Sequence, residues 1–273
     1  MMRRGLIVLA ACVVAACGTT PLPPLALRLA DESADSARRA ADEGMWQAAR
    51  LRWHEAAQRY AVLDDWLHAG MSSLGESQAM MALHDPAASE VMVRAVCDGE
   101  RYPAPVKAEA HYQWALIAAG QQQAALAGEQ LQRAEALAAG DAPLLAAIWN
   151  AEARLAADRH DWQQVLGLAA KAKAAAGAES GEVANAHRLI GEADLHLAQE
   201  AAGRAALETA LQMDRALGRP DAVLHDLTIL AGAAAKWHWA DAALWQERAE
   251  AACRAHLQAS KAGCTPDPAR WDR

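Results

Sequence analysis

Residues 153–172 read ARLAADRHDWQQVLGLAAKA, and this stretch carries the three small-residue positions that decide the fold. Ala156, Val165 and Ala172 each belong to a column that returns every 38 or 39 residues. The three columns are Ala40, Ala79, Ala118, Ala156, Asp194 and Ala233; Ala49, Ala88, Ala127, Val165, Gly203 and Ala242; and Ala56, Ala95, Ala134, Ala172, Ala210 and Ala249. A fixed period of this length indicates a solenoid, in which each unit buries its apolar face only by stacking on its neighbours.

Each unit is predicted to be two amphipathic helices joined by a short turn. In the first unit Gly44 marks the turn, and Trp46, Ala49, Trp53 and Ala56 follow at spacings that place them on one helical face. Small side chains let two helical backbones approach closely, and large ones fill the remaining space. The sequence therefore predicts an all-α fold of about six helical hairpins, of which the second and third are the least regular.

The small–aromatic–alanine pattern of these units resembles that of tetratricopeptide repeats (TPRs). The resemblance covers about residues 26–256 and implies a right-handed superhelical solenoid of helix-turn-helix repeats. Two features depart from the family pattern: the period is 38–39 residues rather than 34, and no proline recurs at the repeat ends. We expect the repeat domain to occupy residues 26–260, with an irregular tail at residues 261–273 that contains Pro266 and Pro268.

Ten tryptophans and no phenylalanine are present in the chain. Their expected role is to fill the space between helices. The alternative, a stacking site for ligands, is best represented by Trp237-His238-Trp239, which is predicted to lie at a turn and to form an exposed aromatic edge.

The N-terminal 17 residues look like a secretion signal. Arg3 and Arg4 precede an apolar run that is too short to span a bilayer, and the run ends in Val14-Ala15-Ala16-Cys17. This ending resembles the lipobox of bacterial lipoproteins, which implies a signal peptide at residues 1–16, cleavage before Cys17 and acylation of its thiol. Residues 17–25 would then be a lipidated cysteine and a short tether. Gly18, where sorting to the inner membrane would favour Asp, implies the outer membrane facing the periplasm; the alternative is an ordinary secreted protein cut nearby.

The charge balance argues against nucleic acid as a partner. The chain has 26 Lys and Arg against 34 Asp and Glu, and removal of Arg3 and Arg4 leaves 24 against 34, a net charge of −10. Nucleic-acid binding needs a basic surface. We expect membrane attachment through the lipid anchor only.

Three cysteines remain after cleavage and lipidation. Cys253 and Cys264 are close in sequence, so a disulfide between them would pin the tail to the last helix in an oxidising compartment. Cys97 is then left over and is expected to be a buried small side chain.

The sequence carries no motif of a known catalytic centre. HExxH, GxSxG, the phosphate loop, GxGxxG and CxxC are all missing, and the ten histidines are spread over the chain. His84-Asp85 and His160-Asp161 are predicted to be turns in which Asp caps the next helix. The sequence therefore predicts no metal, no cofactor and no enzymatic activity.

A binding groove is implied by the TPR resemblance, because the first helices of TPR hairpins line the concave side. Asn150 with Arg154, and Arg188 with Glu192, are four residues apart and share a helix face. Asn150, Arg154 and Arg188 partly resemble the residues with which some TPR proteins clamp a peptide carboxylate; the alternative is ordinary solvated faces and a surface ion pair. The complete predicted groove is Arg38, Met80, Met81, Tyr112, Asn150, Arg154, Arg188, Glu192 and Leu195.

Two functions follow from these observations. The first is a scaffold or adaptor that binds a segment of another envelope protein. The alternative is a periplasmic carrier that binds a small apolar ligand, which the Met and Trp content of a concave fold suggests.

Overall fold

Twelve α-helices make up the computed structural model, which describes residues 22–178 and 180–260; these residues contain no β-strand. The helices are α1 (Leu25–Asp42), α2 (Trp46–Val62), α3 (Trp66–Ala82), α4 (Pro86–Asp98), α5 (Ala104–Gly120), α6 (Ala124–Leu137), α7 (Ala142–Asp158), α8 (Trp162–Ala175), α9 (Gly181–His196), α10 (Glu200–Ala216), α11 (Pro220–Lys236) and α12 (Ala242–Ser260). They pair into six hairpins, α1 with α2 through α11 with α12, so the predicted all-α solenoid is confirmed.

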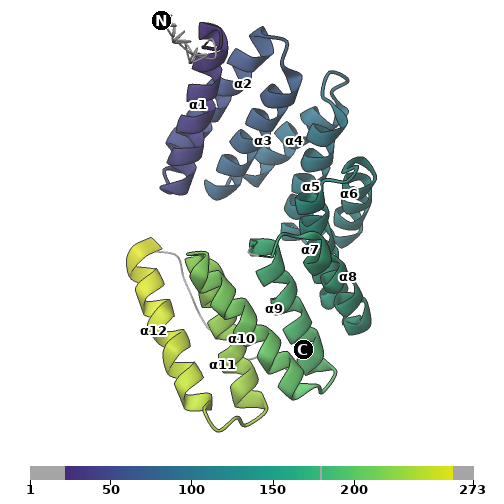
Figure 1. Cartoon of the computed structure of the whole chain (residues 1–273), viewed down its shortest axis with the longest axis vertical. Helices are drawn as coiled ribbons and strands as arrows, with labels where there is room; N and C mark the ends of the chain where they lie inside the picture. Colours follow the sequence, from purple (N-terminus) through teal and green to yellow (C-terminus); the bar gives the residue numbers. More distant parts are fainter. Residues whose placement is uncertain (1–21, 179, 261–273) are drawn as a thin grey trace, which may run out of the picture.

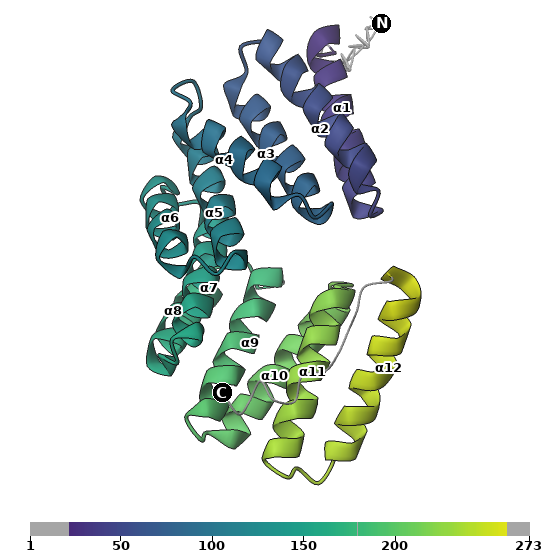
Figure 2. The same ribbon diagram turned by 180° about the vertical axis from the view of Figure 1, so that it is seen from behind.

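The hairpins follow one another along a curved path (Figures 1 and 2). The helices α1 and α12 lie at its two ends, and α5 to α8 form the bend. Each helix packs on the next one along the chain, and the odd-numbered helices from α3 to α11 also contact one another across the hairpins. In both views α6 and α8 lie on the outer side of the bend, so the odd-numbered helices form its inner layer.

The turn inside each hairpin holds one residue in the left-handed region. These residues are Gly44, His84, Gln122, His160, Ala198 and His238, with φ between 53° and 71°. The side chains of Asp85 and Asp161 follow two of these turns and accept hydrogen bonds from the backbone N–H groups of Ala88 and Gln164, each at 3.1 Å. The predicted His-Asp turns with capping aspartates are therefore confirmed.

The second hairpin departs from the predicted columns. Forty residues separate the left-handed positions Gly44 and His84, so the buried positions of α4 move one residue along the chain. Ser89 and Val96 are buried there, whereas Ala95 is exposed. The assignment of Ala88 and Ala95 to the small-residue columns was wrong for this reason, while the column from Ala40 to Ala233 is buried throughout.

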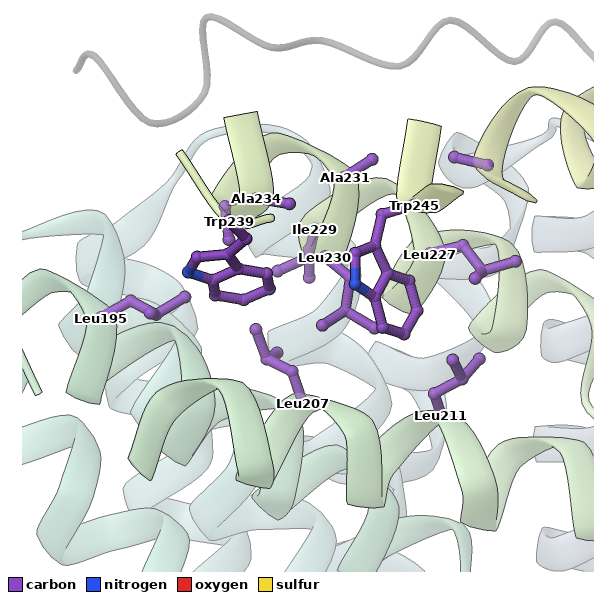
Figure 3. Packing of buried hydrophobic residues seen from close by; sticks show 12 residues of the cluster. Leu195, Leu207, Leu211, Leu227, Ile229, Leu230, Ala231, Ala234, Trp239 and Trp245 are labelled. Carbon is purple, nitrogen blue, oxygen red and sulfur yellow. The ribbon is translucent and has the colours of Figure 1, made fainter. Parts of the chain in front are cut away.

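The last two hairpins share a core built around two tryptophans. Trp239 and Trp245 are 7% and 5% exposed, and Figure 3 shows their indole rings next to Leu207 and Leu230. Trp239 therefore fills the space between helices, and the expectation that it belongs to an exposed aromatic edge was wrong.

Candidate functional site

Two clefts involve the inner layer of odd-numbered helices. Cleft 1 has a volume of about 320 Å³ and lies between α1, α2, α3 and α5. Cleft 2 has a volume of about 380 Å³ and lies between α5, α6 and α7. The residues that line cleft 1 are Ala34, Arg38, Trp53, Tyr60, His68, Met71, Ser72, Leu74, Gly75, Gln78, Glu109 and Gln113.

Aromatic side chains make up one wall of cleft 1. Trp53 can lie against α3 because position 75 is glycine: a Cβ at Gly75 would come within 2.6 Å of the Trp53 ring. The rings of Tyr60 and His68 stack with centroids 5.1 Å apart. The Arg38 guanidinium lies 6.0 Å from the Trp53 ring centroid.

Two polar side chains of α5 line the same cleft. Gln113 is 6% exposed, and its Nε2 donates a hydrogen bond to Glu109 Oε1 at 3.1 Å. The carbonyl oxygen of Gln113, Oε1, is buried and accepts no hydrogen bond from the residues that the structure describes. Burial raises the pKa of Glu109, the hydrogen bond from Gln113 opposes that rise, and the charge of Asp141 adds to it. No lysine or arginine in the described ranges forms an ion pair with Glu109.

Cleft 2 is lined mainly by alanine and leucine. Leu116 of α5 is 45% exposed at this cleft. Arg154 and Asp158 of α7 supply the charged groups. The cleft can therefore accept an apolar side chain beside a polar backbone or a charged group.

The predicted groove residues divide by their exposure. Arg38 lines cleft 1, and Arg154 lines cleft 2. Met81 is 38% exposed, while Tyr112 and Glu192 are half-buried. The structure therefore brings Arg38 and Arg154 to the clefts but not to each other.

Met80 and Asn150 lie inside the fold rather than on the groove surface. Their exposed fractions are 8% and 5%, and Leu195, also predicted to line the groove, is 1% exposed and belongs to the core of the last hairpins. Asn150 Nδ2 donates to the backbone oxygen of Glu182 at 2.9 Å and to its carboxylate Oε2 at 2.7 Å. Asn150 thus ties α7 to the start of α9.

Arg188 also lies in the interior, which corrects its placement in the groove. It is 3% exposed and forms ion pairs with Asp214 and Asp226, both of which are fully buried. Arg219 pairs with Asp214 at 2.7 Å and donates to the backbone oxygen of Gly181 at 3.0 Å. This network joins α9 to the α10–α11 junction, so Arg188 holds two hairpins together.

Cys97 is buried, as expected for a small core side chain. Its Sγ lies 3.6 Å from His111 Nδ1, and burial raises the pKa of the thiol to about 12. The thiolate needed for nucleophilic attack is therefore disfavoured. Cys17 and Cys264 lie outside the described residues, so lipidation and the pairing of Cys264 with Cys253 remain predictions.

The described residues contain no metal-binding cluster and no helix that could span a membrane. They contain no cluster of three or more His, Cys, Asp or Glu side chains that could hold a metal ion. None of the helices traced here is long and apolar enough to cross a bilayer.

The residues that line the clefts were only partly accessible to sequence reasoning. Glu109 and Gln113 are four apart on a first helix, the same signal that selected Asn150 with Arg154. That spacing says that two side chains share a helix face but not whether a neighbouring helix covers the face. Burial of Arg188 depends on Asp214 and Asp226, and no local pattern connects these residues.

Comparison with known proteins shows the fold. No protein-family model and no curated protein matches the sequence. A kinesin light chain-like protein of Podosopora anserina with nearly identical TPR-like repeats is similar in structure, with a TM-score of 0.52 and 16% identity over 72% of this chain and 100% of that one. BtubC (BKLC) from P. vanneervenii is similar with a TM-score of 0.51 and 14% identity over 90% of this chain and 96% of that one. The chain therefore has the fold of TPR-like repeat proteins.

Proposed function

We propose that this chain is a non-enzymatic scaffold, anchored by lipid at the periplasmic face of the outer membrane, that binds a segment of another envelope protein. The observation that carries the proposal is the pair of clefts that share α5 of the inner layer. Each cleft combines apolar surface with a few polar groups, as binding sites usually do. A TPR-like fold itself favours a role in binding proteins. The sequence that resembles a lipobox supports the location.

The alternative, a carrier for a small apolar molecule, has less support. Gln113 Oε1 is buried at cleft 1 without a donor, and Glu109 lies beside it. An apolar ligand would leave the carbonyl oxygen unpaired, which is unfavourable in a buried site. A polypeptide can supply both apolar side chains and hydrogen-bond donors.

Site-specific photocrosslinking in cells of the native host would test the scaffold. A photoreactive amino acid would replace Met71 at cleft 1 or Leu116 at cleft 2, both of which are exposed. The control position is Gln163, an exposed residue of the even-numbered helix α8. We expect the same envelope protein to crosslink from both clefts and not from Gln163. A partner captured equally from all three positions, or none from either cleft, would contradict the proposal.

The lipid anchor is tested separately from partner binding. Cys17→Ser removes the thiol that would be acylated while leaving the repeat domain unchanged. We expect the variant to leave the membrane fraction, whereas Cys97→Ser protein should stay in it. Equal membrane retention of the wild type and Cys17→Ser would remove the lipid anchor from the proposal without affecting the crosslinking result.

A further inference from the structure

We propose that cleft 1 holds a Lys or Arg side chain of the bound polypeptide, with Glu109 and Gln113 as its hydrogen-bond acceptors. This inference rests on the proposed function, because it specifies the chemistry of one of its two clefts. It predicts that a basic residue in the partner determines affinity at the α1–α5 end of the inner layer.

Cleft 1 contains hydrogen-bond acceptors without matching donors. Buried side-chain oxygens in proteins nearly always accept a hydrogen bond, yet Gln113 Oε1 accepts none from the described residues. Its neighbour Glu109 receives a hydrogen bond only from Gln113 Nε2. A carboxylate has room for several donors, and a Lys ammonium or an Arg guanidinium has only donors to offer. A cationic side chain would therefore satisfy both groups together.

The charges around Glu109 also favour a cation at cleft 1. The pKa of Glu109 is raised by burial and by the negative charge of Asp141. The pKa of Tyr112, one turn along α5, is raised by burial and by the charges of Glu182 and Glu109, and the charge of Arg154 opposes this rise. Three carboxylates therefore create a negative field on this part of the inner layer, in a chain whose net charge is −8. A positive partner group is favoured there.

Arg38 is the one cationic side chain of Lys or Arg type among the residues that line cleft 1. It lies on α1, whereas Glu109 and Gln113 lie on α5, and α3 runs between these two helices in Figure 1. Arg38 is paired with Asp35 on its own helix. It therefore leaves the acceptors on α5 available to an incoming cation.

The aromatic wall of cleft 1 suits a long basic side chain. Trp53 lies flat against Gly75 and lines the cleft together with Tyr60 and Met71. Long basic side chains place their methylene stems along apolar surface, and their charged heads are attracted to the faces of aromatic rings. The wall would hold the stem while Glu109 and Gln113 bind the head.

The test uses fluorescein-labelled pentapeptide amides that differ only at the central residue, which is lysine, arginine, norleucine or glutamate. Fluorescence anisotropy with the full mature chain would measure their affinities. We expect the lysine and arginine peptides to bind about ten-fold more tightly than the norleucine peptide, and the glutamate peptide to bind weakest. Norleucine keeps the four-carbon stem of lysine and lacks the ammonium group, so it removes both the positive charge and the hydrogen-bond donors.

Substitutions in the protein test whether the preference for a basic peptide arises at Glu109 and Gln113. Glu109→Gln should weaken binding of the lysine peptide about ten-fold, to the level of the norleucine peptide, and Gln113→Leu should weaken it in the same direction. The matched control is Glu129→Gln on α6, where the wild-type carboxylate pairs with Arg133 at 2.6 Å on the surface. Circular dichroism melts of every variant would show that the fold is intact.

The results of these experiments distinguish a failure of the cation site from a failure of the proposed scaffold function. Equal affinities for the lysine and norleucine peptides, no saturable binding of any peptide, or equal effects of Glu109→Gln and Glu129→Gln would each overturn the cation site. Spermidine binding without a preference for the lysine peptide would also overturn it, because the ligand would then be a small amine. In each case a crosslink from position 71 would still support the proposed scaffold function. The absence of crosslinks from both clefts would contradict the scaffold function itself.

Discussion

Gly191 of α9 and Gly203 of α10 face each other so closely that neither position has room for a side chain. A Cβ at Gly191 would lie 2.9 Å from the backbone oxygen of Gly203, and a Cβ at Gly203 would lie 2.8 Å from the backbone oxygen of Gly191. Leu207 and Leu195 close the space on either side, 2.6 and 2.7 Å from the same two added atoms. The pair therefore sets the distance between the two helices of the fifth hairpin.

Gly203→Ala should destabilise the protein. The added methyl group must push α9 and α10 apart. Overpacking of this kind typically costs about 1–3 kcal/mol. This cost exceeds the stabilisation that the higher helix propensity of alanine contributes. Chemical denaturation monitored by circular dichroism would measure the loss.

The matched control is Gly167→Ala on α8, where an added Cβ meets nothing within 4 Å. There only helix propensity acts, so we expect a gain of about 0.5–1 kcal/mol. If both variants shift stability in the same direction, the close approach of α9 and α10 has no energetic role.

Gly203 also shows which features of the fold could be predicted from the sequence. It was placed in a small-residue column by spacing alone, and the structure buries it where two helices meet. Periodicity is a local signal repeated many times, so the helices, their pairing and the turns at His84 and His160 could be predicted. Ala88 and Ala95 were misplaced because one additional residue before the second turn moves the buried face of α4 by one position. Alanine is so abundant in this chain that the predicted columns did not reveal this shift.

The site was less predictable for a physical reason. Whether a polar side chain on an inner helix reaches solvent depends on which charges the next hairpin supplies. Arg188 meets Asp214 and Asp226 and is buried, whereas Arg154 meets no such pair and is exposed. These contacts join residues 26 or more positions apart, so spacing on one helix carries no information about them.

Arg188→Met should strongly destabilise the last two hairpins. It leaves two buried aspartates with only Arg219 to compensate them, and removal of one partner of a buried ion pair costs about 3–5 kcal/mol. Thermal unfolding would report the loss as a lower Tm. Arg133→Met on the surface of α6 is the control and should change stability by less than about 1 kcal/mol.

A double variant tests the cause of this loss. Arg188→Met combined with Asp226→Leu removes both a buried cation and a buried anion, so it should cost less than the sum of the two single changes. Additive losses would mean that the two side chains do not act as a pair.

Ala198→Gly should stabilise the fifth hairpin. Ala198 holds φ at 60° in the turn between α9 and α10, where a side chain strains the backbone and glycine does not. We expect a gain of about 0.5–1 kcal/mol in urea unfolding. Ala205→Gly, at an exposed position within α10, should instead lose about 1 kcal/mol. A loss at both positions would show that the turn is not strained.

His111 should make the stability of the protein depend on pH. The ring is 8% exposed, its Nδ1 lies 2.7 Å from Gln130 Oε1, and burial lowers its pKa below the ordinary value. A histidine whose pKa is lower in the folded state stabilises the fold fully above about pH 6.5, the value in the unfolded chain, and this contribution is lost as the pH falls further. In urea unfolding between about pH 7.5 and about pH 5.5, protonation of His111 should therefore lower stability, whereas Asp226, whose pKa burial raises to about 7, takes up a proton in this range and contributes in the opposite direction.

His111→Gln keeps a polar partner for Gln130 and cannot take up the proton, so its loss of stability between these two pH values should be smaller. His187 also contributes a loss of stability in acid in both proteins, because burial and Lys173 lower its pKa. The control is His84→Asn, since His84 lies at an exposed turn and Asn tolerates its positive φ. If His111→Gln and the wild type lose the same stability on acidification, then burial of the imidazole does not control the acid sensitivity of the fold.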